Sequence, residues 1–266
     1  MKSILYSFWH GLGDQVMAIP ALKAFKEKNP DTKLGIATLK KIGDRQAREI
    51  LGPYVDDVFP ILSEPWEWPE KFGGTLDEGR VVAMEEAKQC AIDNGYEKVK
   101  EITTSPFLHF HKVRRVSMEL NVYPLKDDRP RIVVPDEYVE FGKEFVKNAE
   151  RPIWFFHWKA RNVLKTLRWR TIKDLLATYS DNYKTIIECD NELANSSMVY
   201  KPRSILETAG LLMNVDKVLC IDSIVMHLAY ALNVPMITLF TMTPPEQVFG
   251  PCPDFTNLTI RRIKNE

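Results

Sequence analysis

Short apolar runs rich in β-branched and aromatic residues alternate with longer amphipathic stretches along most of the chain. Short runs bounded by Gly, Pro and polar residues predict buried strands, and apolar residues that recur every three or four positions predict helices. The repeated strand–helix–strand order is typical of an α/β fold with parallel sheets. The predicted strands are residues 3–9, 33–38, 98–103, 153–157, 184–188, 218–221 and 236–240, with a further strand following the turn in residues 52–59.

The predicted helices are residues 15–28, 42–51, 81–94, 136–150, 172–179, 206–213 and 224–233. Pro20 lies inside the first of these and predicts a kink or a restart of the helix. Residues 63–79, rich in Pro, Gly and Trp, predict a loop, and the residues from Pro251 onward predict a short tail. The charged, proline-punctuated segment 125–135 predicts a boundary between two domains, residues 1–135 and 136–266.

Composition narrows the classes of function. Hydrophobic residues make up 45% and charged residues 27% of the sequence, which is typical of a soluble globular protein. Basic and acidic residues balance at 36 each, so no bulk field favours nucleic acid as a partner. The four cysteines lack C-x-x-C spacing and indicate reduced thiols in a cytoplasmic protein. No apolar span approaches about 18 residues, so any membrane contact would be peripheral, at the inner face of the cytoplasmic membrane.

Polar residues gather on the predicted strand–helix–strand unit near the C-terminal end. Asp222 and Ser223 stand where the helix would begin, and a helix N-terminus with unpaired N–H groups is a site for phosphate. His227 follows one turn later on the same face. Thr243 follows the second strand, at the edge where open α/β sheets bind ligands. Together these residues favour an anion-binding site, although each one alone is compatible with a helix cap or a core histidine.

A glycine-containing turn, H-G-L-G-D in residues 10–14, precedes the first predicted helix. The dinucleotide fingerprint G-x-G-x-x-G is incomplete because its third glycine is Val16, and no Lys-Ser/Thr follows as a P-loop requires. A nicotinamide-dependent oxidoreductase would rest on this G-L-G pattern alone. From its position, Asp14 is compatible with a helix N-cap.

Cations stand at three further places. Residues 109–115 (H-F-H-K-V-R-R) hold five potential cations in seven residues, which is compatible with the solvated end of a helix. His157 and Lys159 follow the predicted strand 153–157, again at the edge that binds ligands. Lys165 and Arg168 precede the helix predicted at 172–179.

Two segments together resemble glycosyltransferase family 9, the ADP-heptose:lipopolysaccharide heptosyltransferases. One is G-L-G-D-Q-V-M-A-I-P-A-L-K-A-F-K from Gly11, and the other is D-S-x-x-x-H-L-A-x-A-L-x-V-P-x-I-x-L-F-x-x-T-x-P from Asp222. The resemblance implies an α/β protein of the GT-B type, in which two Rossmann-like domains face a cleft. It assigns the acceptor side to the first domain and the nucleotide-sugar donor to the second.

The resemblance also implies roles for particular residues. Asp14 would be the catalytic base, and Glu192, or its rival Asp190, would contact the donor sugar or ribose. The other donor-binding residues would be Lys165, Arg168, Asp222, Ser223, His227 and Thr243, with either Lys165 or Arg168 in contact with a phosphate. The phosphate and cleft loops would hold Gly11, Gly13, His157 and Lys159. The acceptor would meet His111, Arg114 and Arg115, unless this run is only the solvated end of a helix.

The chain departs from the family pattern at two places. Ile224 stands where the family has Gly, and Leu167 and Arg170 alter the K-x-W-P motif. These departures favour an alternative function, a catalytically inactive nucleotide-sugar-binding homologue of the same fold.

The expected reaction is transfer of heptose, with inversion, from ADP-heptose to a saccharide or to a glycolipid of the lipopolysaccharide core. The sequence holds neither a D-x-D pair nor H-E-x-x-H, so a metal-independent reaction without a cofactor beyond the nucleotide-sugar co-substrate is expected.

Overall fold

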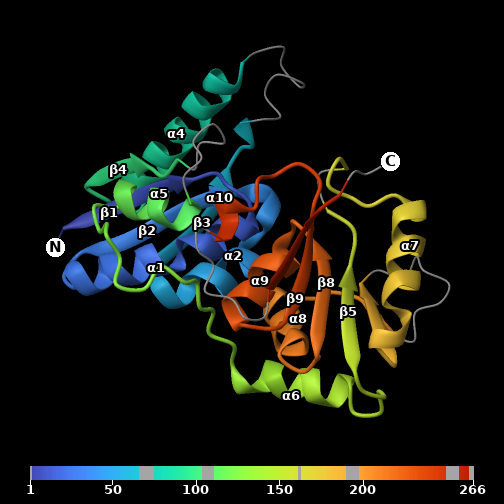
Figure 1. Cartoon of the computed structure of the whole chain (residues 1–266). Helices are drawn as coiled ribbons and strands as arrows, with labels where there is room; N and C mark the ends of the chain where they lie inside the picture. The colour runs from blue at the N-terminus through green and yellow to red at the C-terminus, as the bar shows by residue number, and fades with distance from the viewer. Residues whose placement is uncertain are drawn as a thin grey trace. The chain divides into compact units, whose positions relative to one another are not determined.

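The computed structural model describes residues 2–65, 75–103, 111–160, 163–189, 198–249 and 258–263. The chain divides into two compact units, Met1–Pro130 and Arg131–Glu266, close to the boundary expected after residue 135. Each unit contains its own parallel sheet (Figure 1). Among the described helices, none is both long enough and apolar enough to cross a bilayer.

The first unit is a sheet with helices following its strands. Among its described residues the strands are β1 (Ser3–Phe8), β2 (Lys33–Leu39), β3 (Asp57–Leu62) and β4 (Lys98–Glu101), and the helices are α1 (Leu12–Lys28), α2 (Asp44–Leu51), α4 (Leu76–Asp93) and α5 (Lys112–Glu119). The strand order is β3-β2-β1-β4 and every pairing is parallel. The chain therefore runs outward from β1 to β3 and then returns to place β4 on the other side of β1. The strand order reverses between β1 and β4.

The second unit follows the same plan on a larger sheet. Its described strands are β5 (Ile153–His157), β6 (Thr185–Cys189), β7 (Met198–Tyr200), β8 (Lys217–Ile221), β9 (Met236–Phe240) and β10 (Leu258–Arg262). Its described helices are α6 (Asp136–Phe145), α7 (Trp169–Tyr179), α8 (Ile205–Leu212), α9 (Ile224–Leu232) and α10 (Glu246–Phe249). The order β10-β9-β8-β5-β6-β7, again parallel throughout, reverses between β5 and β8.

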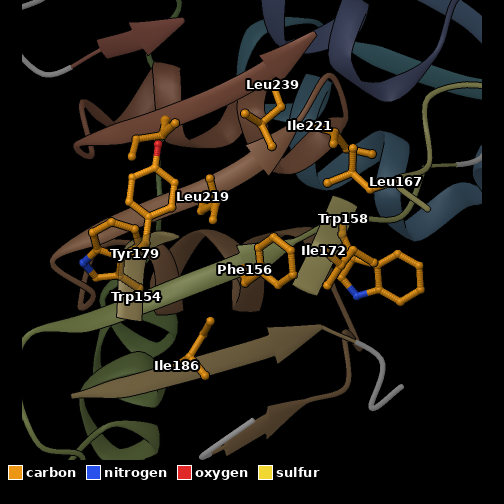
Figure 2. Close-up of a cluster of buried hydrophobic side chains, with 11 residues drawn as sticks. Trp154, Phe156, Trp158, Leu167, Ile172, Tyr179, Ile186, Leu219, Ile221 and Leu239 are labelled. Carbon is orange, nitrogen blue, oxygen red and sulfur yellow. The ribbon is translucent and has the colours of Figure 1, made fainter. Parts of the chain in front are cut away.

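A buried cluster fixes the loop that follows β5. Side chains from β5, β6, β8 and α7 pack together in it, as Figure 2 shows. Trp158 and Leu167, 8% and 2% exposed, belong to the same cluster. Because both ends of the segment between them are anchored in the core, the polar residues that it carries are held at the carboxyl edge of the sheet.

The structure confirms the predicted strand–helix alternation and corrects several boundaries. Helix α1 begins at Leu12 and continues through Pro20, so the expected restart of the helix at this residue is wrong. Helix α4 begins at Leu76, inside the predicted loop, because Thr75 and Glu78 form a capping box. This T-x-x-E pattern is present in the sequence, but it lies beside the Gly- and Pro-rich stretch that predicted a loop.

Three short elements of the second unit were not predicted. They are β7, α10 and β10. Strand β10 pairs with β9 from Leu258 to Arg262, so this part of the expected tail is a sheet edge instead. Its sequence, L-T-I-R-R, is short and lacks a turn signal after it, which explains why periodicity alone did not reveal it.

Helices α6 and α8 pack closely through two glycines. A Cβ atom placed on Gly210 would overlap the carbonyl group of Tyr138, and one placed on Gly142 would overlap the carbonyl group of Gly210. The absence of both side chains therefore sets the distance between α6 and α8, and α8 leads directly into β8.

We predict that Gly210→Ala lowers the free energy of unfolding by about 1–3 kcal/mol, because the methyl group forces two packed backbones apart. Urea denaturation followed by circular dichroism measures this loss. Gly52→Ala is the control: its Cβ would meet nothing within 4 Å and its backbone is already helical, so we expect no loss there. Equal stability of Gly210→Ala and the unmodified chain would contradict the packing argument.

Candidate functional site

The reversal of strand order in the second unit brings the ends of β5 and β8 together. His157 is the last residue of β5, and Ser223 follows β8 at the N-cap position of α9. Ser223 Oγ lies 3.1 Å from His157 Nδ1. The Ser223 side chain makes no capping bond to α9, so the expected capping role of this residue is wrong. Its hydroxyl group instead joins the two strands at the edge where open α/β sheets bind ligands.

Asp222 is the charged centre of this edge. Its side chain is only 7% exposed, and Lys165 Nζ lies 2.6 Å from its Oδ2. The Thr243 hydroxyl group also donates to this carboxylate, and His227 Nε2 lies 3.9 Å from Oδ1. Burial alone would raise the pKa of Asp222, but Lys165, His227 and Thr243 together hold it below its ordinary value. Asp222 is therefore a buried carboxylate that these partners keep ionised.

Lys165 reaches Asp222 because its loop is closed at both ends. The Leu167 amide donates to the Trp158 carbonyl group over 3.0 Å. One residue inward, Thr166 Oγ1 accepts from the Ala160 amide at 2.9 Å and donates to the Ala160 carbonyl group at 3.1 Å. The structure thus brings Lys165 to the carboxylate, whereas Arg168 is exposed at the N-cap position of α7.

Two contacts secure this loop to its neighbours. Trp158 Nε1 donates to Glu188 Oε1 over 3.3 Å, and Glu188 is fully buried near the end of β6. On the other side, Thr241 Oγ1 donates to the Leu164 carbonyl group over 3.2 Å. Sequence reasoning passed over Glu188 because it lies inside a predicted strand, where alternation gives no sign of a polar role.

The remaining predicted residues of this edge differ in their surroundings. His227, on α9, is 4% exposed and lies against Asp222. Burial lowers the pKa of His157 to about 4, so this imidazole is neutral near pH 7. Lys159 is exposed, with its Nζ 5.9 Å from the centroid of the Trp158 ring. Glu192 and Asp190 lie outside the described residues.

The first unit carries a second acid–lysine pair at its own reversal of strand order. Gly11 occupies the N-cap position of α1, and Gly13 and Asp14 lie in the first turn of that helix. The alternative that Asp14 is the N-cap is therefore wrong. Lys112 Nζ, on the first residue of α5, lies 2.5 Å from Asp14 Oδ1. The two side chains are 22% and 19% exposed, so this ion pair is partly shielded from water.

His10 and a group of charges surround this pair. The His10 ring stacks on Trp9 with a centroid distance of 4.1 Å. Glu101, the last residue of β4, accepts from Trp9 Nε1 at 2.8 Å and from Arg80 Nη2 at 3.1 Å. Burial is the main reason that the pKa of His10 falls to about 4, and Lys112 and Arg80 add to this effect against Asp14 and Glu101.

The cation-rich segment 109–115 runs into the first turn of α5, and its described residues have different partners. Arg114 Nε lies 3.6 Å from Asp128 Oδ2, and Arg115 Nη2 lies 2.7 Å from Glu119 Oε1. His111 is 5% exposed at the N-cap position of α5, with Nδ1 3.9 Å from Asp128 Oδ2. Lys112 was not among the predicted acceptor residues, and it is the member of this run that contacts Asp14.

The second unit matches a known family by sequence. The model described as glycosyltransferase family 9 (heptosyltransferase) matches residues 177–260, from the end of α7 into β10. This match confirms the resemblance to the family and includes the second motif, which begins at Asp222; the first motif, which begins at Gly11, lies outside it. No protein of curated function matches the sequence significantly.

Solved structures match nearly the whole chain. The family 9 glycosyl transferase from Veillonella parvula DSM 2008 has a TM-score of 0.67 at 14% identity, covering 98% of this chain and 86% of that one. The E. coli ADP-heptose lps heptosyltransferase II gives 0.64 at 13% identity, covering 100% and 92%. E. coli heptosyltransferase WaaC with ADP gives 0.60 at 15% identity, covering 99% and 94%. Identities this low show the shared fold, an α/β architecture of the GT-B type with two Rossmann-like units.

We predict that His157 stays neutral down to about pH 4, far below its ordinary pKa of 6.5. The unfolded chain takes up a proton near pH 6.5, so His157 stabilises the fold fully above that pH and loses this contribution as the pH falls towards 4. Imidazole ¹⁵N shifts followed from pH 8 to pH 4 measure the titration, with His157→Phe to assign the signal. A midpoint near 6.5 would contradict the burial of this ring.

Proposed function

We propose, from the premise that this chain is a glycosyltransferase whose residues 177–260 match family 9, that it transfers heptose from ADP-heptose to a saccharide hydroxyl group. The observation that carries the proposal is the Lys165–Asp222 ion pair beside the N-terminus of α9. This arrangement supplies a fixed cation and a helix N-terminus at one point, which are the two features that bind a diphosphate.

Lys165 is the residue that would hold the donor diphosphate. An ammonium group has three N–H donors, and the bond to Asp222 uses one of them. A charge-assisted bond to a phosphate oxygen contributes roughly 1.5–3 kcal/mol. The N-terminus of α9 adds about 0.3–1 kcal/mol. Lys165 therefore dominates, and it stabilises the negative charge that develops on the departing diphosphate.

Asp222 would act through Lys165 more than through the donor phosphates. A carboxylate repels a diphosphate, and Asp222 is ionised and already surrounded by Lys165, Thr243 and His227. Its contribution is to fix the ammonium group in place, because an ordered side chain loses less conformational freedom when the ligand arrives. The Asp222 backbone, at the end of β8, also sets the direction in which α9 starts.

Asp14 would be the general base of the reaction. It would take the proton from the acceptor hydroxyl group while the resulting oxygen attacks the anomeric carbon of the donor. Attack from the face opposite the diphosphate inverts that carbon. General-base assistance of this kind contributes roughly 10²–10⁴ in rate.

The donor and acceptor follow from the solved structures that share the fold. WaaC is described with ADP and with ADP-2-deoxy-2-fluoro heptose, and another is described as an ADP-heptose lps heptosyltransferase. These favour ADP-heptose as the donor and a lipopolysaccharide-core saccharide as the acceptor for this chain. We propose a metal-independent reaction because the sequence has no D-x-D pair.

A second candidate function is a nucleotide-sugar-binding protein without transferase activity. The observation that favours it is Ile224, the first residue of α9, because the family pattern has Gly at this position and a glycine lets the backbone approach a diphosphate closely. Transfer of sugar, or donor hydrolysis above background, by the unmodified chain would exclude this function.

We predict that Lys165→Met weakens ADP binding about 10- to 100-fold, which corresponds to the loss of one charge-assisted bond. Calorimetric titration with ADP, UDP and GDP, without added metal, gives the affinities. Lys173→Met, which removes an exposed lysine that lies over Trp169, is the matched control and should bind ADP as before. Unchanged ADP affinity in Lys165→Met would exclude the phosphate role, and preference for UDP or GDP would exclude ADP-heptose as the favoured donor.

We predict that Asp14→Asn lowers turnover by about 10²–10⁴ while ADP affinity stays the same, because a base is lost and the donor unit is intact. Transfer from ADP-heptose to a lipopolysaccharide-core saccharide gives the turnover, and NMR of the product gives the anomeric configuration. Asp44→Asn is the matched control, since Asp44 also lies in the first turn of a helix in this unit. An equal loss of turnover and ADP affinity in Asp14→Asn would contradict the role of base.

A further inference from the structure

We propose that Lys112 is a positioning residue for Asp14, holding its carboxylate ionised and oriented and so setting the pH range in which it can act as a base. This inference rests on the proposed function, in which Asp14 is the base. It concerns a residue for which the sequence motifs give no role.

The geometry of the pair is the first argument. Lys112 Nζ lies 2.5 Å from Asp14 Oδ1, and both side chains are about one-fifth exposed. The two residues come from the first turns of α5 and α1, two helices of the first unit. At this distance and degree of shielding, an opposite charge strongly favours the ionised form of a carboxyl group. The contact also fixes which oxygen of Asp14 is engaged, and thereby the direction of the other.

The position of Lys112 in its own helix is the second argument. A helix N-terminus carries a partial positive charge, so a cation in the first turn is unfavourable. Helix α5 has no acidic residue in its first turn to offset this. Lys112 therefore does not serve the stability of α5. The favourable interaction of the lysine at this position is its ion pair with the carboxylate of Asp14, which lies on a different helix.

The neighbouring charges are engaged elsewhere, which is the third argument. Arg80 and Glu101 bond to each other, and Trp9 donates to the same carboxylate of Glu101. His10, in electrostatic range of all four charged groups, is neutral because its pKa is about 4. Within the described part of the first unit, Lys112 is a cation in direct ion-pair contact with Asp14.

These contacts give Lys112 two opposing effects on catalysis. The ammonium group favours the carboxylate form, so the base stays available at lower pH. The same stabilisation lowers the affinity of Asp14 for the proton that it must accept. Lys112 therefore makes Asp14 a weaker base, but it widens the pH range in which Asp14 is ionised and fixes the orientation of its carboxylate.

The test compares Lys112→Met with Lys112→Arg in the full chain. Without the cation, we expect the acidic limb of the kcat/KM profile to move to higher pH by roughly one unit or more, the range that a neighbouring opposite charge produces. Loss of orientation should lower kcat at neutral pH about tenfold, with the KM for the donor unchanged. Lys112→Arg should keep the position of the limb, and Lys23→Met, an exposed lysine on α1, should behave like the unmodified chain.

A second readout does not depend on activity. Carboxyl ¹³C shifts, with Asp14→Asn to assign the signal, follow the titration of Asp14 directly. In Lys112→Met the Asp14 midpoint should rise, and the pKa of His10 should rise above about 4, because Lys112 lowers it. Both shifts should be absent in Lys112→Arg.

The two proposals fail in different ways. An unmodified chain that transfers no sugar would overturn the proposed function, while the ¹³C titration would still decide whether Lys112 controls Asp14. An unmodified chain that transfers sugar, together with a Lys112→Met variant whose pH limb and Asp14 titration stay in place, would overturn the role of Lys112 alone.

Discussion

A parallel sheet that winds in both directions from one strand must leave an open edge where the direction changes. The helices that follow the two strands on either side of this point cover opposite faces, so nothing in the crossovers fills the space at their carboxyl ends. In the first unit this point lies between β1 and β4, and in the second it lies between β5 and β8. Every candidate residue that the structure brings into contact stands beside one of these two points.

Charge at such an edge is stable only when it is paired. A carboxylate as buried as Asp222 would shift towards its neutral form if it stood alone, because burial disfavours the ionised state. Lys165 and Thr243 reverse that tendency. The loop closed by Trp158, Leu167 and Thr166 therefore matters as much as the charged atoms, since it delivers the lysine to the carboxylate.

The sequence predicts the architecture well because the apolar runs are short and strongly bounded. Strand 153–157 and strand 236–240 have the predicted limits, and the positions of Asp222, Ser223 and His227 around the start of α9 follow from local spacing. Boundaries were less accurate where a local signal competed with composition. The capping box at Thr75 began α4 inside a Gly- and Pro-rich stretch, and Pro20 did not interrupt α1, whose residues 15–22 are all buried.

Contacts between distant residues could not be predicted in the same way. Lys165 and Asp222 are separated by 57 positions, and their pairing depends on which strands become neighbours in the sheet. Sequence reasoning therefore left Lys165 and Arg168 as equal alternatives. Lys112 was overlooked for the same reason, because no local pattern links the start of α5 to the first turn of α1. Spacing reveals which residues share an element, but strand order decides which elements share an edge.

Both units have an acid–lysine pair at the same point of their sheets, but the side chain with the main proposed role differs between them. Each places an acid–lysine pair at its reversal of strand order, beside a histidine that burial keeps neutral, His10 in one unit and His157 in the other. A neutral imidazole adds polarity without adding charge to the pair beside it. Under the proposed function, the first unit would use the carboxylate of its pair, with the lysine in support. The second unit would use the lysine of its pair, with the carboxylate in support. A reaction that needs a base for one substrate and a cation for the other can thus be built from the same two side chains placed at the same point of two similar sheets.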